Sequence, residues 1–280
     1  MMVTLERKWD ERVGPWHSHV TSAPAFERLL RELIELAAPR PSDTCVDLGA
    51  GTGFVTLALA PLTSSVLAVD ISGAMTSALA ERAAEQGLAN VATQISDLRD
   101  LQRRSGRTDL VVSSYALHHL PDPDKRALVA RAARWLRPGG RLVIGDMMFG
   151  RGMSPRDRAI LRQKVAALAT KGPGGLWRIA KNLTRYGLRV GQEHPVPPEF
   201  WLAALRDAGL VDVTFRPIVA EAGLVRGIRP DEAGRTGREL TGQELTGRAP
   251  NARRLRAGLL RARQPAADLG PGPPSDFGLG

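Results

Sequence analysis

Short apolar runs recur along the first half of the chain, and each ends at glycines or at a polar residue. Runs of this length, rich in Val, Leu and Ile, are typical of strands that are covered on both faces. The pattern therefore predicts a parallel sheet with helices between its strands. The five runs are residues 45–48, 65–70, 91–95, 109–114 and 142–145.

Helical patterns flank these runs. Residues 25–36 place leucine and isoleucine on one side of a helix, and residues 1–40 as a whole are predicted to be mainly helical. Residues 198–209 begin with proline and end with glycine, which favour the start and the end of a helix respectively. The sheet is thus preceded and followed by predicted helices.

The composition is that of a protein with one main folded domain. The 280 residues are 43% hydrophobic and 24% charged, which suffices for one sizeable core. Cys45 is the only cysteine, so neither an internal disulfide nor a metal site of several cysteines is available. Residues 1–14 are too charged for a signal peptide, and no apolar run approaches the length of a membrane span. We therefore expect a cytoplasmic protein.

Positive charge is concentrated in one segment. The formal net charge is +10, and residues 151–189 hold ten basic residues and one acid. Two helices are predicted there, over residues 154–169 and from Leu176, and the second has a basic stripe. Such a helix suits an anionic ligand, a membrane surface or nucleic acid, and equally a solvated charged face. Few aromatic residues interrupt the segment, which disfavours nucleic acid.

The first apolar run leads into a glycine-rich turn. Asp47 precedes Gly49, Gly51 and Gly53, whose missing side chains let the backbone approach a ligand at the start of the next helix. The spacing is GxGxG, and Phe54 stands where the dinucleotide fingerprint GxGxxG has its third glycine. This disfavours a nicotinamide dinucleotide. Alone, the turn is also compatible with an ordinary connection between a strand and a helix.

The turn resembles the first motif of the class I S-adenosylmethionine-dependent methyltransferases. In that family the glycine loop passes under the methionine part of the cofactor, and the acid before the loop helps to hold the cofactor's amino group. The resemblance implies this second role for Asp47. It implies cofactor contacts for the loop residues Gly49, Ala50, Gly51, Thr52 and Gly53.

Two further acids follow in the order that the resemblance implies. Asp70 ends the second run, where the family places a carboxylate on both ribose hydroxyls. Asp97 follows the third run, where the family uses an acid to accept from the adenine amine; capping a helix is the alternative for it. For Met75, near the base in relatives, the alternative is core packing. The remaining implied cofactor contacts are Ile71, Met75, Leu98 and Ser114.

Later segments extend the resemblance. ALHHLPDP at residues 116–123 and WLRPGGRLVI at residues 135–144 resemble the ubiquinone and menaquinone methyltransferase group and its small-molecule relatives. The resemblance implies an α/β fold with a doubly wound, Rossmann-like, mostly parallel seven-stranded sheet and a helical insert after the fifth strand. Residues 211–219 and 222–228 resemble the antiparallel pair that closes the sheet.

The candidate catalytic residues are His118, His119 and Asp146, which follow or end the fourth and fifth runs. A histidine is suited to proton transfer near neutral pH. Methyl transfer needs such a base if the acceptor is a phenol or hydroxyl and less so if it is a neutral amine; for a carbon acceptor the need depends on the acidity of the enol or ring system. The alternative for the two histidines is to cap the end of the strand and shape the pocket.

The sequence predicts three parts: an N-terminal helical lid over residues 1–40, a methyltransferase domain over residues 41–228, and a tail over residues 229–280. The domain includes the basic helical insert, residues 151–198. The tail is rich in Gly, Pro and Arg and is expected to be largely disordered. The candidate residues of the lid are Trp9, Trp16, His17 and His19.

The predicted function is methyl transfer from S-adenosyl-L-methionine to a small-molecule acceptor that is anionic or dissolved in a membrane. One alternative is a methyltransferase-like protein that binds the cofactor without transferring methyl, such as a cyclase or a regulator. Another is an RNA methyltransferase that uses the basic insert. Residues 113–116 lack the Asn/Asp-Pro-Pro-Tyr pattern of nucleic-acid and protein amino-methyltransferases, which disfavours an adenine or glutamine acceptor.

Overall fold

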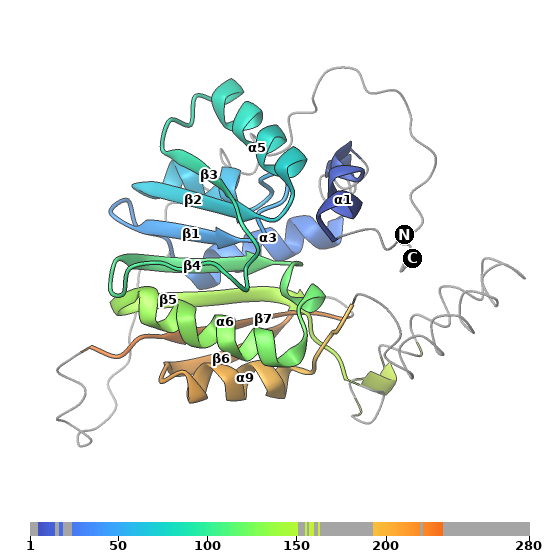
Figure 1. Cartoon of the computed structure of the whole chain (residues 1–280). Coiled ribbons are helices and arrows are strands. Elements are labelled where there is room, and N and C mark those ends of the chain that lie inside the picture. Colours follow the sequence, from blue (N-terminus) through green and yellow to red (C-terminus); the bar gives the residue numbers. More distant parts are fainter. Residues whose placement is uncertain are drawn as a thin grey trace, which may run out of the picture.

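The centre of the fold is a seven-stranded sheet with the order β3-β2-β1-β4-β5-β7-β6 (Figure 1). It is seen in a computed structural model that describes residues 5–14, 17–18, 24–150, 155, 157–159, 162, 193–218 and 221–231. Neighbouring strands from β3 to β5 are parallel, and β7 is antiparallel to both β5 and β6. The mostly parallel sheet implied by the sequence is confirmed. Its strands are β1 (Thr44–Leu48), β2 (Ser65–Asp70), β3 (Val91–Ile95), β4 (Thr108–Ser114), β5 (Leu136–Met147), β6 (Val211–Pro217) and β7 (Ala222–Ile228).

All five apolar runs form strands, and the two closing segments form the expected antiparallel pair. β5 is longer than predicted because Leu136 already pairs with Thr108, ahead of an irregularity in the register between Thr108 and Leu110. Residues 137–140 are arginine, proline and two glycines, so the hydropathy pattern does not indicate that the strand already begins at Leu136.

Helices cover both faces of the sheet (Figure 1). Helices α6 and α9 pack on one face, and α3, α4 and α5 pack on the other. The predicted helix at residues 198–209 is confirmed as α9, and the helical pattern at residues 25–36 is confirmed as α3. The helices are α1 (Leu5–Asp10), α3 (Pro24–Ala37), α4 (Thr56–Leu59), α5 (Gly73–Glu85), α6 (Asp122–Trp135) and α9 (Pro198–Asp207), with 3₁₀ turns η1 (Ala60–Leu62) and η2 (Leu117–His119).

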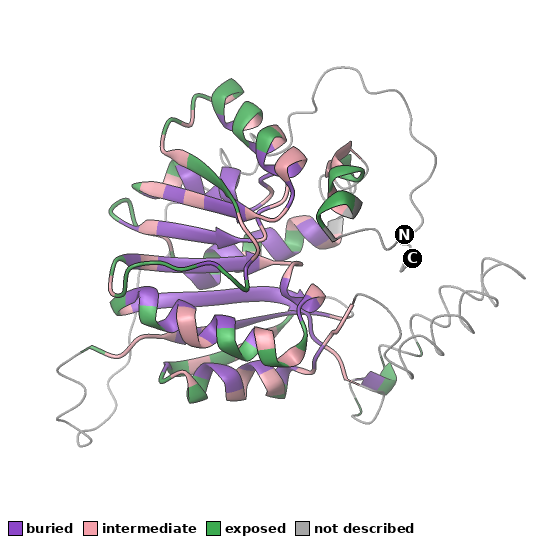
Figure 2. Cartoon of the chain, in the orientation of Figure 1, coloured by how far each residue is buried: buried purple, intermediate pink, exposed green. Residues whose placement is uncertain are grey.

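The core lies in two layers, one on each face of the sheet, and the buried strands separate them (Figure 2). Alternate residues of a strand point to opposite faces, so Val46 belongs to the layer under α6 and α9 whereas Cys45 belongs to the layer under α3 and α4. Likewise, Val111 belongs to the layer under α6 and α9, and Val112 belongs to the layer under α3 and α4. This double burial explains why the strands read as continuous apolar runs.

One buried ion pair joins the start of the sheet to the end of α3. Arg141 of β5 donates to Asp43 at 2.5 Å, and both side chains are buried. The same guanidinium donates to the carbonyl oxygens of Ala37 (3.0 Å) and Ala38 (3.1 Å). Arg141 therefore satisfies backbone acceptors that the end of α3 leaves without partners inside the helix.

Several predictions lie outside the described residues: the second helix of the basic insert, the tail beyond residue 231, and the lid residues Trp16 and His19. Of the first predicted insert helix, only residues 155, 157–159 and 162 are described, and these are helical. Within the described part of the chain, no helix has the length and apolar character needed to cross a membrane. The described residues also bring together no group of three or more histidines, cysteines and acids that could hold a metal ion.

Candidate functional site

The glycine-rich turn after β1 is held against β2 by its backbone. The amides of Gly49 and Ala50 both donate to the carbonyl oxygen of Val69, at 2.8 and 3.0 Å. Gly49 has a φ of 71°, and a Cβ atom built on it would lie 2.2 Å from the Cβ of Ala116. Because any side chain would collide there, glycine is required both by the conformation and by the contact with the turn that follows β4.

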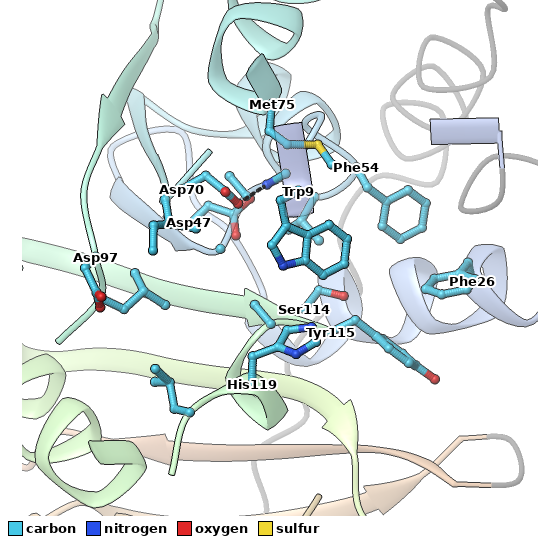
Figure 3. Close-up of a pocket in the computed structure, with 18 residues that line it drawn as sticks. Trp9, Phe26, Asp47, Phe54, Asp70, Met75, Asp97, Ser114, Tyr115 and His119 are labelled. Carbon is cyan, nitrogen blue, oxygen red and sulfur yellow. Dashed lines mark hydrogen bonds between the residues drawn. The ribbon is translucent and has the colours of Figure 1, made fainter. Parts of the chain in front are cut away.

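A pocket opens at the carboxyl ends of the parallel strands, where open α/β sheets bind ligands (Figure 3). Ten of the twelve residues that the sequence assigns to the cofactor line it, and His119 lines it too. Thr52, Gly53, His118 and Asp146 do not line it. The predicted residues that the pocket brings together are Asp47, Gly49, Ala50, Gly51, Asp70, Ile71, Met75, Asp97, Leu98, Ser114 and His119.

Three acids of the pocket, Asp47, Asp70 and Asp97, come from or directly follow three adjacent strands; they are called the pocket acids below. Asp47 is 1% exposed and accepts a hydrogen bond of 2.7 Å from the hydroxyl of Thr56. Burial raises the pKa of Asp47 to about 7, although the hydrogen bond from Thr56 opposes the change. Asp47 therefore changes charge near neutral pH.

Asp70 links the two turns that border the pocket. Its carboxylate accepts from the amide of Gly51 at 2.8 Å and from the amide of Ser72 at 3.0 Å. Burial raises the pKa of Asp70, and these two backbone hydrogen bonds oppose the rise. The side chain is thus fixed in position at the end of β2.

Asp97 is paired with Arg99. The guanidinium of Arg99 approaches to 2.6 Å, and the amide of Arg99 donates to the same carboxylate at 2.8 Å. These hydrogen bonds, above all those of the side chain, lower the pKa of Asp97, so it is ionised at neutral pH. A carboxylate has about four acceptor sites, and Arg99 uses much of this capacity.

Thr52 and Gly53 contact residues around the turn and do not line the pocket. The hydroxyl of Thr52 lies 3.4 Å from Nδ1 of His17, and its carbonyl oxygen accepts from Arg82. Burial, with Arg82 nearby, lowers the pKa of His17 to about 4. A Cβ atom on Gly53 would lie 3.0 Å from Leu57, so that glycine allows close packing of the next helix.

The three candidate catalytic residues form a connected group, of which only His119 lines the pocket. Nδ1 of His118 lies 2.6 Å from Asp146, and the amide of His118 donates to the other carboxylate oxygen at 2.9 Å. Both residues are buried. The rings of His118 and His119 lie 4.0 Å apart. Asp146 thereby fixes the η2 turn that carries His119.

Helix α1 lies next to the pocket and to the N-terminus of α5. Asp10 accepts from the hydroxyl of Ser72 at 2.5 Å and from the amide of Ala74 at 3.2 Å. Trp9, the lid candidate beside it, lines the pocket and meets His119 edge to face with ring centroids 5.3 Å apart.

Sequence reasoning missed several lining residues. Tyr115 directly follows the predicted Ser114 and could have been found from its place at the end of a strand. Phe26 gives no such signal, because it reads as one apolar position of an amphipathic helix. The missed residues are Phe26, Phe54, Val55, Tyr115, Ala116 and Leu120.

Residues 45–140 match the protein family described as "Methyltransferase domain". The chain is 35% identical to nocamycin O-methyltransferase of Saccharothrix syringae, over 55% of this chain and 62% of that protein. It is 34% identical to trans-aconitate 2-methyltransferase of Deinococcus radiodurans, over 69% of this chain and 66% of that protein. It is 30% identical to the ubiquinone/menaquinone biosynthesis C-methyltransferase UbiE of Acidiphilium cryptum, over 66% of this chain and 73% of that protein. The chain thus spans slightly less than two thirds of the first two relatives.

Solved structures share the fold at low sequence identity. The [4+2]-cyclase SpnF has a TM-score of 0.59 at 15% identity, over 81% of this chain and 95% of that one. A geranyl diphosphate methyltransferase in complex with GPP and sinefungin has a TM-score of 0.52 at 18% identity, over 70% of this chain and 75% of that one.

Proposed function

Because this chain belongs to the family of S-adenosylmethionine-dependent methyltransferases, we propose that it transfers a methyl group from that cofactor to a small-molecule acceptor. The names of the relatives support a small acceptor, since nocamycin O-methyltransferase and trans-aconitate 2-methyltransferase are named for small molecules. We also propose a cytoplasmic location and the division into lid, domain and tail that the sequence suggests.

The residues present fit the cofactor of the family. The observation that carries the proposal is the combination, in one pocket, of a turn whose Gly49 leaves no room for a Cβ atom beside Ala116 and the pocket acids at three adjacent strand ends. The cofactor carries an ammonium, two ribose hydroxyls and an adenine amine, and each of these donates hydrogen bonds. We assign them to Asp47, Asp70 and Asp97 in that order.

When bound, the cofactor would supply a methyl group already activated on a sulfonium, which the acceptor would take with its own electron pair while the C–S electron pair stays on sulfur. The protein is then required mainly to align the two partners and exclude water. The backbone of Gly49 and Gly51 and the apolar side chains of Ile71, Met75 and Leu98 suit these tasks, because they line the same pocket as the acids.

A base is needed where the acceptor is a hydroxyl. We propose His119 for this role, because it lines the pocket whereas His118 and Asp146 do not. His118 and Asp146 are positioning residues in this proposal: the buried pair holds η2, and η2 presents His119 to the acceptor.

Calorimetric titration with S-adenosylhomocysteine, the demethylated product, tests the proposal. The wild-type protein is expected to bind it, and Asp70→Asn is expected to weaken binding about tenfold or more, since a charged hydrogen-bond acceptor is lost. Asp207→Asn is the matched control, because Asp207 is exposed on α9 and does not line the pocket. Failure of the wild type to bind, or equal affinity in Asp70→Asn and wild type with unchanged thermal unfolding, overturns the assignment.

A further inference from the structure

The pocket has two chemically different sides (Figure 3). The pocket acids lie on the left of the view. Aromatic rings occupy the other side, with the indole of Trp9 between the two. If the cofactor lies along the acids, as proposed above, the aromatic side remains for the acceptor. We call this side the ring wall; it consists of Trp9, Phe26, Phe54, Tyr115 and His119.

The charges of the pocket disfavour an anion. Among the described residues that line it there is no lysine or arginine, and there are three carboxylic acids. Acidic side chains suit the net positive cofactor, whereas an anionic acceptor needs a positive charge beside it. Arg99, beside the pocket, has its guanidinium on Asp97. The described walls therefore supply no cation to hold a carboxylate or phosphate of the acceptor.

The rings contact one another across segments that are distant in the sequence. Phe26 of α3 meets Phe54, in the turn after β1, edge to face at 5.9 Å between centroids, and meets Tyr115 at 4.8 Å. Trp9 of α1 meets His119 of η2 at 5.3 Å. Rings arranged in this way offer flat, apolar surfaces with defined orientations, which suit another aromatic molecule.

The backbone of Tyr115 has an unfavourable conformation, which the surrounding structure maintains. Its φ is 50°, in the left-handed region, which is rare for a bulky residue. Its amide donates to the carbonyl oxygen of Gly145 at 2.8 Å, and this bond to β5 fixes the turn. The turn brings Tyr115 into the pocket directly after Ser114, which lines it too.

Trp9 is placed by its neighbour. Asp10 binds the N-terminus of α5 through Ser72 and Ala74, so α1 is anchored to the helix that carries Met75. The indole of Trp9 is thereby set between the cofactor side and the acceptor side (Figure 3).

We infer that the acceptor is an uncharged, flat aromatic molecule that lies against the ring wall, with Trp9 and Phe54 as residues that determine its specificity. The inference rests on the proposed function and replaces the anionic acceptor that the sequence suggested. A hydroxyl on such a molecule would be within the same pocket as His119, the base proposed above.

Binding of two probes to the full chain, saturated with S-adenosylhomocysteine, tests this inference. The probes are 2-naphthol, which is flat and uncharged at pH 7, and trans-aconitate, which is a tricarboxylate. Titration calorimetry is expected to detect 2-naphthol and to give at least tenfold weaker binding, or none, for trans-aconitate. Trp9→Leu and Phe54→Leu are expected to raise the Kd for 2-naphthol about two- to tenfold each, the loss of one aromatic contact. Phe200→Leu is the matched control, because Phe200 packs against Arg126 on the α6 and α9 side and does not line the pocket.

Three results overturn the inference: no binding of 2-naphthol, tighter binding of trans-aconitate, or equal Kd values for 2-naphthol in Trp9→Leu, Phe54→Leu and Phe200→Leu. Binding of S-adenosylhomocysteine is measured first in each protein. If that binding is present and a naphthol result fails, only the inference about the acceptor is wrong. If the wild type does not bind S-adenosylhomocysteine, the proposed function itself fails.

Discussion

Gly49→Ala tests whether the contact between the glycine turn and the turn after β4 is essential. The new methyl group would lie 2.2 Å from the Cβ of Ala116, far inside normal contact distance. Ala116 is followed by η2, which carries His118 and His119, so a shift of Ala116 displaces the proposed base as well. The substitution also forces alanine to adopt a φ of 71°.

The cost of the left-handed backbone and the cost of the collision with Ala116 can be measured separately. Left-handed backbone costs an alanine about 1–2 kcal/mol, and inserting a methyl group into a packed site costs about 1–3 kcal/mol. The matched control is Gly87→Ala, because Gly87 has a φ of 66° and a Cβ atom there meets nothing within 4 Å. Gly87→Ala therefore has the first cost alone, and Gly49→Ala has both.

Urea unfolding followed by circular dichroism gives the stability of each variant, and calorimetry gives its affinity for S-adenosylhomocysteine. Gly49→Ala is expected to lose about 1–3 kcal/mol more stability than Gly87→Ala and to bind the product more weakly. Gly87→Ala is expected to bind it like the wild type. Equal losses of stability in the two variants, together with unchanged binding, would refute the reasoning about the contact between Gly49 and Ala116.

Two other predictions follow from buried charges. Arg141→Ala leaves Asp43 buried without its ion-pair partner and is expected to cost about 3–5 kcal/mol in urea unfolding. Arg216→Ala, which removes partly exposed ion pairs to Glu32 and Glu35, should cost less than about 1 kcal/mol. Similar losses in both would contradict the account of that pair. The raised pKa of Asp47 means that the folded protein keeps a proton which the unfolded chain releases above about pH 4. Asp47 thus lowers stability as pH rises from about 4 to 7, while binding of S-adenosylhomocysteine should strengthen as the pH rises through about 7 and Asp47 becomes charged. Asp47→Asn should abolish both the fall in stability between about pH 4 and 7 and the strengthening of binding near pH 7. If stability and binding of Asp47→Asn match those of the wild type at every pH, Asp47 is not their cause.

The sequence was sufficient for the sheet because its strands are buried on both faces. Val46 and Cys45 face different layers, yet both must be apolar, and the run is visible without any knowledge of its partners. The length of β5 was not predictable in this way, since Leu136 joins the sheet through a pairing with Thr108 that hydropathy does not encode.

The acids of the site were predicted from the resemblance to the methyltransferase family, and they lie together because each stands in or shortly after a strand whose end meets the ends of its parallel neighbours. Trp9 and His119 of the ring wall were among the candidates, as a lid residue and a possible base. The contacts of Phe26 and Trp9 within the pocket could not be predicted, because both reach it from helices that precede the sheet. Their positions depend on tertiary contacts, such as that of Asp10 with Ser72, which no local pattern indicates. The pairing of Asp97 with Arg99 was also missed, although the two residues are neighbours in the sequence.

The central claim is that one pocket holds the cofactor along three acids at adjacent strand ends. A crystal structure of the protein with S-adenosylhomocysteine tests it most directly. The account predicts the ribose hydroxyls within hydrogen-bonding distance of Asp70, the amino group near Asp47 and the adenine near Asp97. Product bound elsewhere, or absent from this pocket at saturating concentration, would contradict it.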